Sequence, residues 1–277
     1  MKVKVFGKIN LVLNILGKEK DMHVLDMLNT SISLYDEIDV KVREDEIINI
    51  DITSDDNTLD KDLYCKAVKG ALDKFFNKYG KKGLDISIVK NIPLGAGLGG
   101  GSAPIVGVLK CLYLSINKEP DNNELLTYGS DVPYMWKGGF ARVSHLGEIV
   151  EPLGDLNVSL VIAKPNSGID TKDSYDLYDK IAPKKDNVIS IDDMLDGEFI
   201  SFQNALEKPS IKLNKDILTL QKLINKNGFD CCMTGSGSGV FFLVYNAESA
   251  DKVRFVLENE KFWTVCCNSV NTGIVTI

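Results

Sequence analysis

The sequence predicts an α+β protein built of two layered domains, and three observations support that fold class. The chain has 277 residues, enough for one large domain or for two smaller ones that each bury a core. Stretches of alternating apolar residues, typical of strands, are mixed with stretches whose apolar residues recur every three or four positions, as in helices. A boundary is predicted near residues 147–157, which divides the chain into domains at residues 1–150 and 151–277.

The first segments of the chain are predicted to be strands. Residues Lys2–Lys8 alternate, and the extended pattern continues to Ile15. Alternation returns at Ile32–Val42, where we expect a turn at Tyr35–Asp36. A helix is predicted from Asp60 to about Lys78, because apolar residues recur there every four positions.

A strand, a glycine run and a second helix come next. Gly80 and Gly83 interrupt the chain, and Leu84–Val89 is an apolar, strand-like segment. After the glycine run, the spacing of five residues predicts one buried helix face: Ile105, Leu109, Leu112, Tyr113 and Ile116.

The second half is also mixed. A strand at Val158–Ala163 stops at Pro165, and the polar stretch Pro183–Asp196 predicts a loop or a short helix. The remaining elements are a helix that ends at Asn227–Gly228, two strands around a glycine turn within Asp230–Tyr245, an amphipathic helix over residues 250–257 and a last strand around Thr264–Cys267.

The composition is that of an ordinary soluble protein and argues against several classes. Hydrophobic residues make up 44% and charged residues 26% of the chain. A formal charge of −7 argues against a nucleic-acid-binding surface, which is normally basic. No stretch approaches the roughly 20 apolar residues that span a bilayer, and Met1–Phe6 lacks the features of a signal peptide. We therefore expect a cytoplasmic protein with neither a nucleic acid nor a membrane as partner.

The cysteines and histidines predict neither a disulfide framework nor a metal site of soft ligands. The only histidines are His23 and His145, and no C-x-x-C spacing occurs. We interpret the six cysteines (65, 111, 231, 232, 266 and 267) as small buried residues in a reducing compartment. Trp136 and Trp263 are assigned to packing.

The most informative segment is the glycine run within Asn91–Ala103, with five glycines between Gly95 and Gly101. It follows a strand and opens into a helix, so unpaired N–H groups and the positive end of the helix dipole are expected to converge on one point. That arrangement predicts a phosphate site. The run is neither a Walker A motif nor a dinucleotide fingerprint in its usual setting, and a tight turn without a ligand remains the alternative.

Further motifs lie on both sides of the glycine run and together span almost the whole chain. They are Lys8-Ile-Asn-Leu11, His23, Leu34-Tyr-Asp-Glu37, Pro93–Ser102, Ser130-Asp-Val-Pro133, Gly147-Glu148 and Thr234-Gly-Ser-Gly237.

In this order and chemistry the chain resembles the GHMP kinases, the superfamily of galactokinase, homoserine kinase, mevalonate kinase and phosphomevalonate kinase. The resemblance implies an N-terminal domain like ribosomal protein S5, a ferredoxin-like C-terminal domain and an active site in the cleft between them. It also implies an ATP-dependent kinase for a small molecule, with Mg²⁺ as cofactor. Phosphoryl transfer requires a held phosphate, a compensated charge and an oriented hydroxyl, which these motifs can supply.

By this resemblance, the catalytic residues are Lys8 and Asp131. Asp131 would take or orient the proton of the substrate hydroxyl, and a neighbouring lysine would keep that carboxylate ionised. Ser102, at the start of the helix, is the candidate hydroxyl for a phosphate or for Mg²⁺. The expected nucleotide-binding residues are Pro93, Gly95, Gly97, Leu98, Gly99, Gly100, Gly101 and Ser102.

The substrate side is assigned in the same way. Asn10 and His23 would bind the acceptor, His23 as a hydrogen-bond partner of a cytosine ring. The turn Thr234–Gly239 would close over the phosphates, and its residues Thr234, Gly235 and Ser236 are also expected to contact the substrate. An exposed loop histidine and an ordinary hairpin turn are the alternatives for His23 and for this turn.

Two departures from the family pattern bear on the substrate. Met22 stands where the family usually has a tyrosine, which removes an expected aromatic face, and Ala103-Pro104 replaces a polar pair after the glycine run. The resemblance implies 4-diphosphocytidyl-2-C-methyl-D-erythritol, of non-mevalonate isoprenoid synthesis, as the expected substrate. The alternatives are a divergent paralogue for another alcohol or phosphomonoester and a non-catalytic nucleotide- or partner-binding member. A monomer and a homodimer are both compatible with the sequence.

Overall fold

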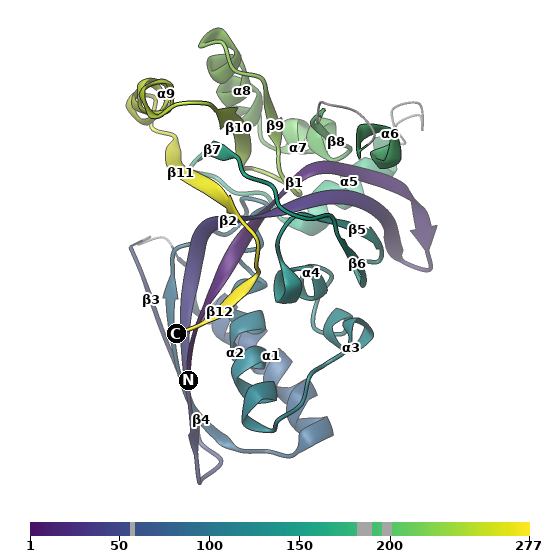
Figure 1. Ribbon diagram of the computed structural model, residues 1–277, viewed down its shortest axis with the longest axis vertical. Coiled ribbons are helices and arrows are strands. Elements are labelled where there is room, and N and C mark those ends of the chain that lie inside the picture. Colours follow the sequence, from purple (N-terminus) through teal and green to yellow (C-terminus); the bar gives the residue numbers. More distant parts are fainter. Residues whose placement is uncertain (56–58, 182–189, 196–200) are drawn as a thin grey trace.

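The computed structural model describes residues 1–55, 59–181, 190–195 and 201–277. Its two halves follow one another along the longest axis, and both termini lie in the half that holds α1 and α2 (Figure 1). The elements of the first half are β1 (Lys2–Glu19), β2 (Met22–Arg43), β3 (Ile48–Ser54), α1 (Lys61–Tyr79), β4 (Gly83–Lys90), α2 (Ala103–Ser115), α3 (Asn122–Leu126), α4 (Val132–Lys137), β5 (Ala141–His145) and β6 (Ile149–Pro152).

The second half holds the remaining helices and strands. They are β7 (Ser159–Lys164), α5 (Thr171–Ile181), α6 (Ile191–Leu195), β8 (Gln203–Asn204), α7 (Glu207–Leu213), α8 (Asp216–Lys226), β9 (Cys231–Met233), β10 (Val240–Val244), α9 (Ala247–Asn259), β11 (Trp263–Val270) and β12 (Ile274–Thr276).

The first two strands form one long antiparallel hairpin, paired from Lys2↔Asp39 to Glu19↔Met22. The predicted strands are confirmed, but the predicted turn at Tyr35–Asp36 is wrong, because β2 continues through both residues. The register shifts between Phe6 and Gly7, so the strand has an irregularity there instead of a chain reversal. Such a bulge bends a strand while pairing resumes on either side.

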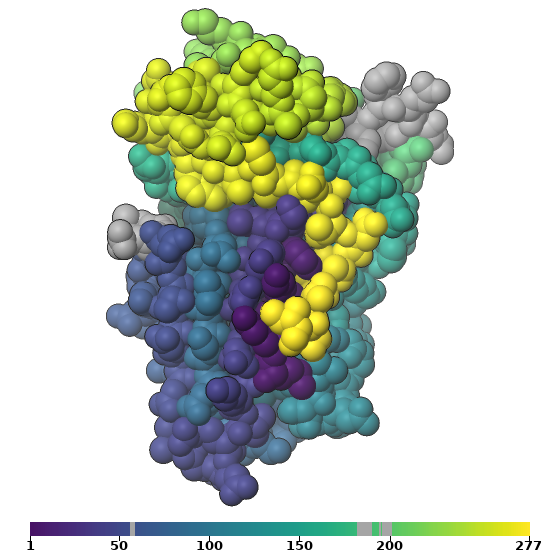
Figure 2. Space-filling view, turned by 60° about the vertical axis from the view of Figure 1, so that its left-hand side comes forward, coloured from purple at the N-terminus to yellow at the C-terminus, as the bar shows by residue number. Residues whose placement is uncertain are grey.

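A single strand near the C-terminus joins the sheets of the two halves. The strand order is β12-β1-β2-β11-β7-β10-β9, with β3 and β4 extending from β2 on a branch. One end of β11 pairs with β7 and the other with β2, and β12 pairs with β1. Figure 2 shows the C-terminal segment lying across the N-terminal strands. The domain boundary at residues 150/151 stays a prediction, and the last strands return across it.

Helices α1 and α2 cover one face of the β1–β4 sheet (Figure 1). Asp60 caps α1, since its side chain accepts the N–H of Leu63, and Gly80 ends the helix, so the predicted bounds are confirmed. Helix α2 packs closely on β2: a Cβ at Gly107 would lie 2.7 Å from Ile38 Cδ1. The chain that follows the glycine run is therefore fixed against the central hairpin.

The predicted elements of the second half are largely confirmed. β7 stops before Pro165, α8 ends at Asn227–Gly228 and β9 and β10 flank the glycine turn. Of the stretch Pro183–Asp196, predicted to be a loop or a short helix, the structure describes only residues 190–195, which contain the short helix α6. The rest lies outside the described residues. Helices α5 and α7 and strand β12 were not predicted.

The six cysteines are free thiols, but not all are buried. Cys111, Cys232 and Cys267 are buried as predicted, whereas Cys266 is exposed. Successive side chains of a strand point to opposite faces, so only one of two neighbouring cysteines on β11 reaches the core. Trp136 and Trp263 are partly buried and pack against the core, in line with the prediction. No helix in the described ranges is long and apolar enough to cross a membrane.

Candidate active site

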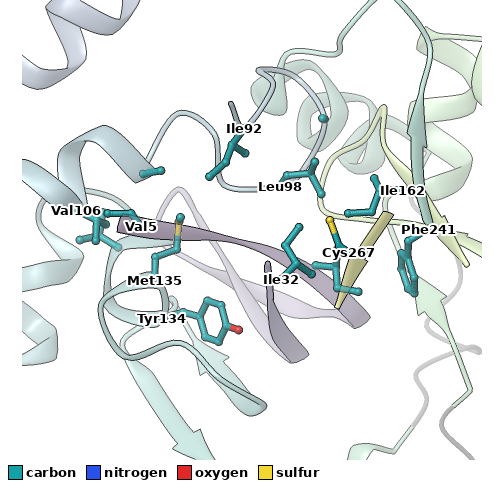
Figure 3. Packing of buried hydrophobic residues seen from close by; sticks show 14 of the residues in the cluster. Val5, Ile32, Ile92, Leu98, Val106, Tyr134, Met135, Ile162, Phe241 and Cys267 are labelled. Atoms are coloured by element: carbon teal, nitrogen blue, oxygen red, sulfur yellow. The ribbon is translucent and has the colours of Figure 1, made fainter. Parts of the chain in front are cut away.

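The glycine run forms a loop in which backbone reversals alternate with buried anchors. Gly95, Gly97 and Gly99 have positive φ angles of 60°, 69° and 79°. Between them, Ala96 and Leu98 are each 1% exposed. Figure 3 shows Leu98 in the core cluster that also contains Ile32, Ile162 and Cys267. Backbone whose φ changes sign in this way turns successive N–H groups towards one concave side.

Every carbonyl from Gly95 to Gly100 is occupied by a donor from the protein. Three donors come from the turn at Thr234–Gly239 and two from the start of α2. The other two are the backbone N–H of Lys8 and the side chain of Lys90. The contacts are Ser238 N to Gly95 O (2.7 Å), Gly239 N to Ala96 O (3.2 Å), Thr234 Oγ1 to Gly97 O (3.4 Å), Lys8 N to Leu98 O (3.1 Å), Ser102 N and Ala103 N to Gly99 O (both 3.0 Å), and Lys90 Nζ to Gly100 O (2.9 Å).

The N–H groups of the same loop are in the opposite situation. Among the described residues, none of the seven N–H groups from Gly95 to Gly101 donates to a protein acceptor. In a trans peptide the N–H points opposite to the preceding carbonyl, so fastening the carbonyls also fixes the directions of the N–H groups. The loop is therefore a row of oriented donors without partners, which is what an anion requires.

The turn at Thr234–Gly239 lies directly against the loop. A Cβ at Gly97 would lie 2.0 Å from Thr234 O, so only glycine allows this approach. Thr234 Oγ1 also accepts the N–H of Asn10 at 2.9 Å. The three motifs that the sequence singles out at the N-terminus, in the middle and near the C-terminus meet at this point.

Lys8 and Asp131 lie beside the loop. Lys8 is 4% exposed, and its Nζ is 3.8 Å from Asp131 Oδ1 and 2.7 Å from Asn10 Oδ1. Asn10 in turn donates to Asn29 Oδ1 at 2.7 Å, which orients its amide. The Asp131 side chain is 34% exposed and makes no capping hydrogen bond to α4. One carboxylate oxygen is thus near an ammonium group while the carboxylate remains accessible.

These groups surround one cavity of about 220 Å³. Its wall combines the loop and the charged pair with an apolar side formed by Leu13, Leu25 and Met27. The predicted site residues that line it are Lys8, Asn10, Pro93, Gly95, Gly97, Leu98, Gly99, Gly100, Gly101, Ser102, Asp131, Gly235 and Ser236.

The comparisons with known proteins agree with this geometry. The N-terminal domain of the GHMP kinases matches residues 66–139, and their C-terminal domain matches residues 189–262. The chain is similar to the 4-diphosphocytidyl-2-C-methyl-D-erythritol kinase of Clostridium acetobutylicum, with 31% identity over 94% of this chain and 96% of that protein. The chain belongs to the GHMP kinase family.

Another relative and two solved structures are also similar to the chain. The kinase of the same name from Clostridium beijerinckii is 34% identical over 88% of this chain and 90% of its own. A crystal structure of 4-(cytidine 5'-diphospho)-2C-methyl-D-erythritol kinase matches with a TM-score of 0.75 and 25% identity, over 97% of this chain and 99% of the other. A homoserine kinase from Cytophaga hutchinsonii shares the fold, with a TM-score of 0.68, 18% identity and coverage of 100% and 97%.

Membership of this family confirms the predicted two-domain GHMP kinase fold. It also makes the chain a small-molecule kinase that uses ATP.

His23 lies beside the cavity of this GHMP kinase rather than in its wall. Its Nε2 is 2.8 Å from Asp179 Oδ1, and its ring lies 4.6 Å from that of Tyr175, centroid to centroid. The alternative of an exposed loop histidine is wrong, because His23 is on β2 and its side chain is 11% exposed. Met22, by contrast, is 45% exposed and does not line the cavity.

Tyr175 is a site residue that sequence reasoning missed. It lies on α5 and lines the cavity with Thr171 of the same helix. A single tyrosine in an amphipathic helix has no signature of its own, because its place depends on how α5 docks against the hairpin. The sequence offered one signal for this residue: Tyr175 lies four positions after Thr171, so the two side chains share one face of a helix.

The Ala103-Pro104 pair is accommodated in the first turn of α2. Pro104 occupies one of the first two helical positions, where a missing N–H costs no helical hydrogen bond. The hydroxyl of Ser102 makes no capping bond to the helix, so it is available to a ligand in the cavity. The prediction that the fold tolerates this pair is confirmed.

A second cavity, of about 500 Å³, adjoins the start of the loop at Asn91–Pro93. Pro93 lines both cavities, so the two meet at the start of the loop. The second cavity is framed by Leu59 and Ile92 from the first half and by Lys164 and Trp263 from the second.

Proposed function

We propose that this GHMP kinase transfers the γ-phosphoryl group of ATP to a hydroxyl of 4-diphosphocytidyl-2-C-methyl-D-erythritol. The phosphate part of the proposal rests on the seven loop N–H groups that donate to no acceptor within the described residues, while six loop carbonyls are hydrogen-bonded. The relatives that bear this kinase name, at 31–35% identity over most of the chain, support the acceptor.

The nucleotide is proposed to extend from one cavity to the other. Its phosphates would lie on the loop N–H groups from Gly95 to Gly101, close to the N-terminus of α2. Its base would enter the second cavity past Pro93, where Leu59 and Trp263 offer apolar surface. The two cavities then divide the nucleotide into a charged and a mostly apolar part.

A magnesium ion is compatible with the residues present. Ser102 lines the cavity with a hydroxyl that makes no capping bond to α2, and Mg²⁺ is usually held by one or two protein oxygens together with substrate phosphates. When bound, the ion would neutralise charge on the phosphate oxygens.

Asp131 is proposed as the base for the acceptor hydroxyl. The hydroxyl proton passes to the Asp131 carboxylate, the alcohol oxygen bonds to the γ-phosphorus, and the bond from that phosphorus to the bridging oxygen breaks with its electron pair leaving on ADP. Lys8, 3.8 Å from Asp131, supplies positive charge beside the transferred group. Asn10 holds the Lys8 ammonium in place.

The acceptor is proposed to occupy the part of the cavity lined by Asn10, Tyr175 and Ser236. Asn10, His23 and the turn at Thr234, Gly235 and Ser236 are its expected polar contacts. Tyr175 is the aromatic surface nearest to His23, which offers a cytosine ring a face that Met22 does not.

The test is to identify the phosphorylated product among competing acceptors. The protein is incubated with Mg-ATP and an equimolar mixture of 4-diphosphocytidyl-2-C-methyl-D-erythritol, mevalonate and homoserine, and products are identified by mass spectrometry. Gain of one phosphoryl group by the cytidyl compound alone is expected. Phosphorylation of another acceptor would indicate a divergent paralogue, and ATP binding without any product would indicate a non-catalytic member.

A further inference from the structure

Both ends of the glycine loop are connected to one buried ion pair. Asp36 lies on β2 and Lys90 at the end of β4, and their side chains, which are in contact, are 0% and 1% exposed. Within the described ranges, no other ion pair has both side chains so completely buried. The pair lies beneath the loop and outside the cavity that holds Lys8 and Asp131.

Each member of the pair holds a different end of the loop. Asp36 Oδ1 accepts the N–H groups of Asn91 at 2.8 Å and Ile92 at 2.9 Å, just before the loop. Lys90 Nζ donates to the carbonyl of Gly100 at 2.9 Å, near its end. The loop is thereby closed across ten residues by one carboxylate and one ammonium group.

The stability of the fold alone does not explain this pair. Burial raises the pKa of Asp36 and lowers the pKa of Lys90, because both charged forms lose water. Replacing a buried ion pair by well-packed apolar residues is often neutral or stabilising. What an apolar pair cannot supply is a donor for the Gly100 carbonyl.

The Gly100–Gly101 peptide is the part of the loop that most needs such a donor. Flanking glycines allow a peptide to rotate with little steric resistance. Rotation would turn the Gly100 carbonyl towards the anion and the Gly101 N–H away from it, since the two groups are antiparallel in one rigid unit. The other loop carbonyls are held by the backbone or by Thr234, whereas this one is held by the lysine.

We propose that Lys90, held in place by Asp36, is a positioning residue for the phosphates of the nucleotide. It acts through the Gly100 carbonyl, which it binds so that the Gly101 N–H stays directed at the phosphate site. This inference rests on the proposed function, because it assumes that the loop binds the phosphates of ATP. It assigns the buried pair to nucleotide affinity rather than to the fold.

The test compares Asp36→Asn with the double variant Asp36→Asn/Lys90→Met. Asparagine keeps a carbonyl oxygen for the Asn91 and Ile92 N–H groups, so within this background the second change removes the donor to Gly100. Lys74→Met is the matched control, since Lys74 also donates to a backbone carbonyl, that of Thr127, and neither residue lines either cavity. Equilibrium affinities are measured for ATP and for inorganic tripolyphosphate, with the acceptor KM and far-UV circular dichroism.

Removal of the donor should weaken both ATP and tripolyphosphate about tenfold relative to Asp36→Asn, the effect of one lost hydrogen bond to an oriented group. The acceptor KM and the circular dichroism should not change, and Lys74→Met should match the wild type. The proposal would be overturned if the single and the double variant bound both ligands equally well, or if the double variant lost affinity for ATP but not for tripolyphosphate. Failure of the double variant to fold would overturn it as well. If the wild type binds neither ATP nor tripolyphosphate, the proposed function itself fails.

Discussion

At the scale of single residues, Lys8 is a buried charge that two polar side chains hold in the candidate active site. At 4% exposure its ammonium group has lost most of its water, and the oxygens of Asn10 and Asp131 replace it. Such partners are needed because an unpaired buried charge costs several kcal/mol. The same contacts fix the ammonium group of Lys8 next to Asp131, whose carboxylate lines the cavity.

The acceptor side should depend on Tyr175 and not on Met22. We expect Tyr175→Ala to raise the acceptor KM about 5- to 10-fold, the effect of losing an aromatic contact of about 1 kcal/mol, while Tyr175→Phe keeps most of the affinity. Met22→Ala should leave this KM within about twofold, because Met22 is 45% exposed and outside the cavity. Steady-state kinetics of the three variants measure this KM. A larger increase in KM for Met22→Ala than for Tyr175→Ala would contradict the assignment of Tyr175 to the acceptor side.

His145 should make stability depend on pH. The carboxylates of Glu148 and Glu19 raise the pKa of His145 above its usual value near 6.5. Its contribution is fully present below about pH 6.5 and is lost as the pH rises through the folded-state pKa. We expect the thermal midpoint of the wild type to fall over that window and His145→Gln to lack this component. Parallel curves for the two proteins would refute the coupling.

At the residue scale, sequence reasoning succeeded where several residues act as a motif. Lys8 and Asp131 are 123 positions apart, yet their flanking motifs predicted a shared site, and the structure places them 3.8 Å apart. Tyr175 and the Asp36–Lys90 pair were not predicted as site groups. Their proximity to the loop arises from the docking of α5 and from the register of β2 against β4, which no local pattern reports.

At the scale of the element, the loop combines flexible glycines with rigid anchoring. Ala96 and Leu98 are buried in the core, so the backbone between them is held, while its N–H groups donate to no acceptor in the part of the chain that the structure describes. The sequence predicted a phosphate loop between a strand and a helix, and β4 and α2 flank it as expected. The sequence could not predict that the turn at Thr234–Gly239, 137 to 143 positions further along the chain, would hydrogen-bond the loop carbonyls, because this requires the tertiary approach of Gly97 to Gly235.

Two glycine-to-alanine changes should have opposite effects. Gly97→Ala places a Cβ 2.0 Å from Thr234 O at a φ of 69°, so we expect a loss of about 3 kcal/mol or more in the free energy of unfolding. Gly70 lies on the exposed side of α1, and a Cβ added there would have no atom within 4 Å outside its own helical turn. Gly70→Ala should therefore raise the free energy of unfolding by about 0.5–1 kcal/mol. Urea denaturation measures both; a tolerated Gly97→Ala would show that the approach to Thr234 is not required.

At the scale of the whole molecule, the two halves share sheet and site. β11 continues the sheet from β7 to β2, and the loop of the first half is fastened by Ser238 and Gly239 of the second. The sequence predicted two domains and a cleft between them, and the two-domain fold is confirmed. The return of β11 and β12 to the first sheet was missed, since strand order is set by long-range pairing.

The shared sheet should make unfolding a single cooperative event. Each half holds one of the two tryptophans, Trp136 and Trp263. Fluorescence of Trp263→Phe therefore reports on the first half, and that of Trp136→Phe on the second. We expect the two variants, each compared with its own circular dichroism, to give coincident urea transitions. A fluorescence transition in either variant that precedes the loss of secondary structure would show that the halves unfold separately.

The central claim is that the loop holds ATP while Lys8 and Asp131 act on the acceptor hydroxyl. The most direct test measures ADP release that depends on 4-diphosphocytidyl-2-C-methyl-D-erythritol, in the wild type and in Asp131→Asn, with ATP affinity measured in parallel. We predict turnover by the wild type, a kcat lower by about 10²–10⁴-fold in Asp131→Asn and an ATP affinity that is nearly the same in both. Undiminished turnover by Asp131→Asn would contradict the account, and so would the formation of ADP from ATP at a rate that does not depend on the acceptor.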